Sequence, residues 1–98
     1  MRVKIAYTVD LEEVEKEVSY RMTRAVNDLD FCYQELIRLQ MDLDTKAGTL
    51  DNHISLIDTI RIKMAKADQV LEDCQSILHG LEQTKKQIEE QENEVQDG

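Results

Sequence analysis

The stretch Leu43-Asp44-Thr45-Lys46-Ala47-Gly48-Thr49-Leu50 decides the fold, because two long runs with the same apolar repeat meet there. In each run the apolar residues alternate by three and four positions, which is typical of a coiled-coil helix. Gly48 suits the position after a helix end, and Thr49 can cap the next helix through its side-chain oxygen. The stretch therefore predicts a turn between two long helices.

The two helices are predicted over residues 10–47 and 50–86, with the turn at 48–49. The apolar stripe of the first helix consists of Leu11, Val18, Met22, Ala25, Leu29, Cys32, Leu36, Leu39 and Leu43. That of the second consists of Leu50, His53, Ile57, Ile60, Met64, Ala67, Leu71, Cys74, Leu78 and Leu81. Stripes of matched length predict an antiparallel hairpin. A register centred on the turn would pair Ala25 with Leu71 and Ala67 with Leu29. Each small residue would then face a large one, so the core would have a similar side-chain volume at every level.

Residues 1–9 are predicted to form a β-strand ahead of this mainly α-helical fold. Polar and apolar residues alternate there, with Val3, Ile5, Tyr7 and Val9 on one face. Asp10 and Glu13 then supply a capping box for the first helix. The rest of the chain offers no second strand, so we expect the strand to pair with another copy, to pair with a target, or to lie on the helices.

The apolar surface is wider than a two-helix seam requires. Further apolar residues flank the stripes at Val26, Tyr33, Ile37, Leu56, Val70 and Ile77. Together with the strand, these residues favour a homo-oligomer in the form of a helical bundle. The alternative is that they are scattered exposures of ordinary size.

The charge of −9 over 98 residues argues against direct binding to nucleic acid or to anionic membranes, since counterion release needs clustered Lys and Arg. The acidic tail over 87–98 is predicted to fray. The start of the sequence has no hydrophobic signal core, so we expect a cytoplasmic protein. Cys32 and Cys74 lie on the apolar stripes and are predicted to be reduced core residues.

The sequence carries no catalytic or metal signature. His53 lies beside the turn and is most simply a capping or partly buried histidine. No phosphate-binding glycine loop, metal-binding motif or activated nucleophile is present in the sequence. We therefore expect no enzyme activity and no cofactor.

Two basic groups interrupt the acidic sequence, and each could hold an anionic ligand. They are Tyr20, Arg21 and Arg24 in the first helix, and Arg61, Lys63 and Lys66 in the second. Arginine beside tyrosine can bind a phosphate and stack on a base. The alternative is that these cations pair with neighbouring carboxylates along each helix.

The opening Lys4-Ile5-Ala6-Tyr7-Thr8-Val9-Asp10-Leu11-Glu12-Glu13-Val14 resembles the start of small uncharacterised proteins encoded by tailed bacteriophages. The likeness covers about a tenth of the chain and implies no site residues. It implies a context in which small phage proteins bind and disable a host system, or sequester something from it.

Three hypotheses about function follow. The first is a non-enzymatic, homo-oligomeric coiled-coil protein that binds a partner protein and, in a phage, inhibits a host defence system. The second is a sponge that sequesters a small anionic nucleotide at a subunit junction. The third is an acidic mimic of nucleic acid that occupies a basic groove.

Overall fold

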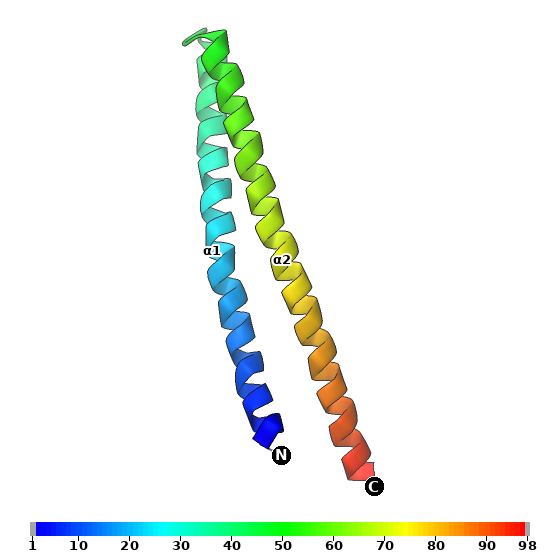
Figure 1. The fold of residues 1–98 in the computed structure, drawn as a ribbon. Helices are drawn as coiled ribbons and strands as arrows, with labels where there is room; N and C mark the ends of the chain where they lie inside the picture. The colour runs from blue at the N-terminus through cyan, green and yellow to red at the C-terminus, as the bar shows by residue number, and fades with distance from the viewer. Residues whose placement is uncertain (1, 98) are drawn as a thin grey trace.

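The chain folds into one long antiparallel helical hairpin. The computed structural model describes residues 2–97, with side chains described for residues 11–92. Helix α1 spans Arg2–Asp44 and helix α2 spans Leu50–Asp97. The two helices lie side by side from the turn and diverge toward the end that carries both termini (Figure 1), over extents of 75 × 19 × 16 Å. The predicted helical hairpin is confirmed.

The predicted N-terminal strand is wrong for the residues that the structure describes. Helix α1 begins at Arg2 and is continuous through residues 2–9. A helix satisfies its backbone hydrogen bonds within itself, and extending an existing helix is far easier than nucleating one, whereas a lone strand leaves its backbone groups unpaired. The side chains of Val3, Ile5, Tyr7 and Val9 lie outside the described part of the chain, and strand pairing between copies loses its basis.

Helix α2 also runs further than predicted, to Asp97 instead of residue 86. The added stretch is rich in Glu and Gln. Both are good helix formers, so the helix continues although the apolar stripe thins out there. The acidic segment is therefore part of α2 in the structure.

The turn differs in detail from the prediction, since α1 ends three residues earlier, at Asp44. Lys46 takes the left-handed conformation at φ 57°, and its N–H donates to the Leu43 carbonyl at 3.3 Å. The Ala47 N–H donates to the Asp42 carbonyl at 2.8 Å. These two bonds form a Schellman motif, in which Lys46 occupies the position expected for Gly48.

The start of α2 follows the prediction, and His53 ties it to the turn. The Asn52 N–H donates to the Thr49 side-chain oxygen at 3.3 Å, so Thr49 caps the helix. His53 is buried, and its Nε2–H donates to the Ala47 carbonyl at 2.8 Å. Gly48 is also left-handed, at φ 77°, and a Cβ there would lie 3.0 Å from the His53 ring. The prediction of a capping histidine is confirmed.

The core is a single line of residues spaced seven apart on each helix. We call this line the inner row. Its buried members are Val18, Ala25, Cys32 and Leu39 in α1, and His53, Ile60, Ala67, Cys74 and Leu81 in α2.

Contacts of the two thiols define the register of the inner row. Cys32 Sγ lies 3.6 Å from the Ile60 carbonyl oxygen, and Cys74 Sγ lies 3.9 Å from that of Val18. Both thiols are free. By the seven-residue repeat, Ala25 lies level with Ala67, four residues away from the predicted register. The reason is steric: Ala and Cys let the helix backbones approach closely, whereas a leucine opposite each alanine would hold the helices apart.

Candidate interaction surface

The other half of each predicted stripe lies at the surface. We call these residues the outer row: Met22, Leu29, Leu36 and Leu43 in α1, and Leu50, Ile57, Met64, Leu71 and Leu78 in α2. Met22 is half-buried, and the other eight are between 37% and 74% exposed. The structure therefore buries only one of the two lines of residues that the sequence pattern assigned to the core.

Both halves of the outer row lie on the same side of the hairpin. Glu15 and Lys85 extend the outer row by one repeat on α1 and α2, and they form an ion pair at 3.0 Å. On the other side of the inner row, Asp28 and Lys63 each follow an inner-row residue by three positions and pair at 4.0 Å. Each side of the hairpin is thus joined by its own ion pair, and the outer row forms one continuous apolar face.

The side of the hairpin that contains the apolar face is about as large as a protein interface. At 1.5 Å per residue, Leu50 to Leu78 spans about 40 Å along α2. Over the 19 Å width of the molecule, one side of the hairpin of this length projects about 760 Å², polar borders included, close to the roughly 800 Å² that each partner buries in a standard interface.

The total surface of the chain is large for its mass. It amounts to 8205 Å², whereas a compact monomer of 11.4 kDa exposes about 5,800 Å². The excess, about 2,400 Å², reflects the extended shape of the hairpin.

The residues predicted to mediate oligomerisation are divided between two sides. Val26 and Tyr33 are 61% and 62% exposed and each follows an inner-row residue by one position, so they border the apolar face, with Ile37 beyond them. By contrast, Leu56, Val70 and Ile77 are half-buried on the side of the Asp28–Lys63 ion pair. The sequence reasoning missed the outer row as an exposed surface because it placed those residues in the core. The signal in the sequence was the small inner-row residues, which leave the seam no room for a second line of large side chains.

On the side opposite the apolar face, the residues that α1 contributes to the border of the seam are polar. Asp28, Glu35 and Asp42 are half-buried there on α1. Lys63 reaches across from α2 to Asp28, and its Nζ lies 4.6 Å from the centre of the Phe31 ring. These contacts help to close the hairpin on this side.

The six residues predicted to bind an anion are only partly brought together. Tyr20, Arg21 and Arg24 line a hollow of about 600 Å³ on the side opposite the apolar face. Asp73 and Glu17 line it as well, and Glu17 accepts a hydrogen bond from Arg21 Nε at 3.3 Å. Carboxylates in the same hollow oppose an anionic ligand.

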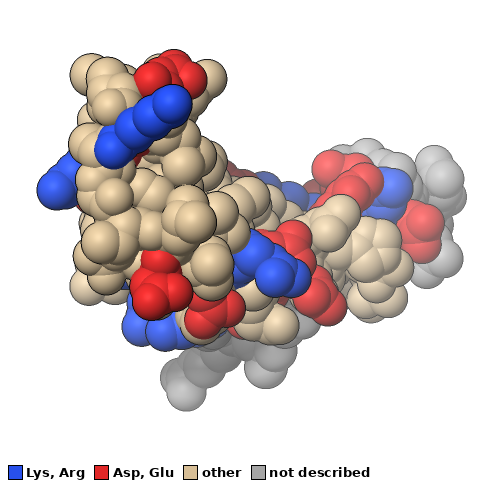
Figure 2. Space-filling model, turned by 90° about the horizontal axis from the view of Figure 1, so that it is seen from above, with Lys and Arg blue, Asp and Glu red and all other residues tan. Residues whose placement is uncertain are grey.

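The second basic group does not join this hollow. Lys63 pairs with Asp28, while Arg61 and Lys66 are exposed on different sides of α2. In the view of Figure 2, Lys and Arg side chains lie in separate small groups among acidic and uncharged residues. The basic residues therefore do not form one positive patch on that face.

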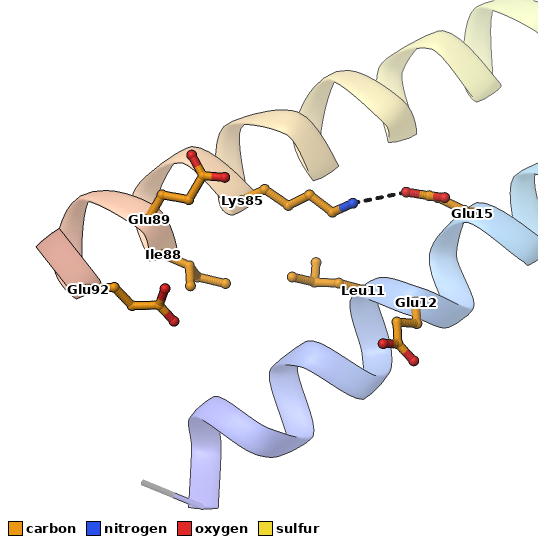
Figure 3. Close-up of a pocket in the computed structure, with 7 residues that line it drawn as sticks. All are labelled: Leu11, Glu12, Glu15, Lys85, Ile88, Glu89 and Glu92. Carbon is orange, nitrogen blue, oxygen red and sulfur yellow. Dashed lines mark hydrogen bonds and ion pairs between the residues drawn. The ribbon is translucent and has the colours of Figure 1, made fainter.

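A second hollow, of about 470 Å³, lies between the diverging helices. Leu11 and Ile88 point toward one another across it, and the Lys85–Glu15 ion pair lies at its inner end (Figure 3). Glu12 and Glu89 are among the other residues that line it. This hollow marks the point where the inner row stops holding the helices together.

The described residues contain no group of three or more His, Cys, Asp or Glu side chains placed to hold a metal ion. Within the same residues, neither helix has an apolar stretch of the length that a membrane span needs. Comparison of the chain with protein-family models, curated proteins and solved structures finds no match.

Proposed function

We propose that this chain is a non-enzymatic, homo-oligomeric coiled-coil interaction protein whose working surface is the apolar face. The observation that supports this function is the outer row: apolar residues at seven-residue spacing, on one side of the hairpin and largely exposed. Contiguous apolar surface of this size marks an interaction site in a soluble protein. The seven-residue repeat matches the packing of helices against helices, so the ligand of this surface is helical.

Binding would be driven mainly by burial of the outer row. Fully burying an exposed leucine side chain stabilises by about 1.5–3 kcal/mol, so each half-exposed residue of the row contributes about 1 kcal/mol. Part of this gain is lost to the entropy of association. The remainder suffices for a stable complex only if most of the face is covered at once, which favours a long helical partner over a short peptide.

The experiment is sedimentation velocity over a range of protein concentrations. We expect the wild-type chain to sediment as a dimer or a larger oligomer, and Leu36→Lys to shift it toward the monomer by placing a charge in the apolar face. The matched control is Met41→Lys, because Met41 is 62% exposed but lies away from the face. A wild-type chain that stays monomeric at every concentration would contradict the proposal, as would equal effects of the two substitutions.

Inhibition of a host defence system by such a protein remains a proposal that rests on the resemblance of residues 4–14 to phage proteins.

Binding of a small nucleotide has one supporting feature, the hollow that contains Tyr20, Arg21 and Arg24. We rank the nucleotide sponge second because Glu17 and Asp73 share that hollow. A thermal shift of the wild-type chain that a nucleotide induces, and that Arg24→Ala abolishes, would reverse this order.

A further inference from the structure

We propose that the occupant of the apolar face is a second copy of this chain, docked face to face and antiparallel, with a two-fold axis through the level of Leu29 and Met64. This inference rests on the proposed function and adds the partner, the orientation and the register. It gives an antiparallel four-helix bundle in which the outer rows of the two copies form a second core.

The length of the α2 half of the outer row points to this register. On α2 the apolar residues extend from Leu50 to Leu78, and Met64 is their midpoint. The contacts of the inner row place Leu29 of α1 within one residue of the level of Met64. A two-fold axis at this level lays the outer row of α2 along its full length on that of the second copy. If the second copy were shifted by one heptad toward the turn, Leu78 would have no outer-row residue of that copy opposite it.

The borders of the apolar face fit the same axis. On α2, Arg61 lies three residues before Met64 and Asp68 lies four residues after it, and both follow an inner-row residue by one position. The two-fold operation therefore brings Arg61 of each copy next to Asp68 of the other. Both side chains are exposed, and no ion pair within the described chain involves either of them.

The border formed by α1 repeats this arrangement with apolar residues. Val26 lies three residues before Leu29, and Tyr33 lies four residues after it. They are 61% and 62% exposed in the single hairpin. The axis places Val26 of one copy beside Tyr33 of the other. An apolar pair therefore forms at this border as an ion pair forms at the other, and the two-fold axis generates each pair twice.

A parallel face-to-face dimer fits less well. With the two-fold axis along the length of the hairpin, α1 of one copy would face α2 of the other at equal distance from the turn. Val26 would then meet Asp68, which places an apolar side chain against a carboxylate, and Glu12 would meet Glu82. Like charges across an interface disfavour a partner, so the charge pattern selects the antiparallel arrangement.

Charge exchange at one border tests the register. Because like charges would then meet at two symmetric places, we expect Arg61→Asp and Asp68→Arg each to weaken dimerisation about tenfold, measured as the dimer Kd by sedimentation equilibrium. The double variant R61D/D68R re-forms both pairs, and its Kd should return to within about threefold of the wild type. Within one helix the two residues are seven positions apart, about 10 Å, so an intramolecular contact does not explain a rescue.

The control for net charge is Lys66→Asp, which changes the charge by the same amount as Arg61→Asp but lies away from the apolar face. Circular dichroism checks that every variant keeps its helix content. If the wild type dimerises but the double variant is as weak as the single ones, or if Lys66→Asp weakens the dimer as much as Arg61→Asp, this register is wrong while the proposed function stands. A monomeric wild type overturns both.

Discussion

The inner and outer rows have the same seven-residue spacing on the same two helices, yet one is buried and the other is exposed. The inner row includes Ala25, Cys32, Ala67 and Cys74, all at most 3% exposed, whereas the leucines of the outer row stay between 37% and 74% exposed. Size explains the difference, because small side chains allow the backbones to approach until the thiols touch carbonyl oxygens of the opposite helix. The comparison shows that a few small residues in the inner row let the helices approach too closely for a second line of large side chains to be buried. The outer row therefore remains available for a partner.

The largest effect is expected from enlarging the inner row. Ala67→Leu should destabilise the hairpin by about 1–3 kcal/mol, since overpacking forces the helices apart. Leu71→Ala, four residues along in the outer row, should cost the isolated hairpin less than about 1 kcal/mol because Leu71 is 42% exposed. Urea unfolding at several protein concentrations separates the two: the cost of Leu71→Ala should grow with concentration as the oligomer forms, and that of Ala67→Leu should not. If the two substitutions lowered the stability equally at every protein concentration, the inner and outer rows would not differ in the way proposed here.

His53→Ala sharpens the comparison at the turn, where the inner row contains its one polar member. The substitution leaves the Ala47 carbonyl without its donor and removes a buried ring, so we expect a loss of about 1–2 kcal/mol. His79 is the matched control, because it is exposed and bonds only to Gln83 on its own helix. His79→Ala should stay within about 0.5 kcal/mol of the wild type in thermal unfolding. If the His53→Ala variant were as stable as the His79→Ala variant, His53 would not contribute to the core as the structure indicates.

Two glycines should respond with opposite signs. Gly48→Ala forces an alanine into a left-handed conformation beside the His53 ring and should cost about 1–2 kcal/mol. Gly80→Ala adds a methyl group to the surface of α2, where it meets nothing within 4 Å, and should stabilise by about 0.5–1 kcal/mol. The readout is the midpoint of chemical unfolding. A stabilised Gly48→Ala variant would mean that the turn does not hold the observed conformation.

The smallest effect is expected at the end of the outer row. Glu15→Gln removes an exposed ion pair with Lys85 and should change stability by less than about 0.5 kcal/mol, with the difference lost at high salt. Asp28→Asn removes the ion pair on the opposite side of the hairpin, where Asp28 is 20% exposed, and should cost more. Unfolding of both variants at low and high ionic strength provides the test. If Glu15→Gln lowered the stability more than Asp28→Asn, the Glu15–Lys85 ion pair would contribute more to the hairpin than the Asp28–Lys63 ion pair, contrary to this expectation.

Much of the fold could be predicted from the sequence because it depends on local signals. The repeat along each run predicts the helices, and Thr49 with its neighbours predicts where α2 begins. The end of α1 could not be predicted as well, since Lys46 adopts the conformation for which Gly48 is the better candidate. The alternation over residues 2–9 predicts a strand by its periodicity, but a strand needs a partner that the described chain does not contain.

The candidate surface was harder to predict. A stripe with three and four spacing contains two lines of residues, and the sequence alone does not say how many helices share the core. Placing both lines in a two-helix seam led to a register with Ala25 opposite Leu71, which the thiol contacts overturn. Pairing of the basic residues with carboxylates along the same helix is one of the predicted alternatives, and the Arg21–Glu17 ion pair follows it. The Lys63–Asp28 ion pair joins the two helices, so it became evident only from their packing.

The two thiols that lie against the backbone of the opposite helix can report on the opening of the hairpin. Cys74 lies further from the turn than Cys32, and neither can react with a reagent in solution while the seam is closed. Their alkylation rates therefore measure how often each level of the seam opens. Unzipping from the termini would modify Cys74 first, whereas all-or-none opening would modify both at one rate.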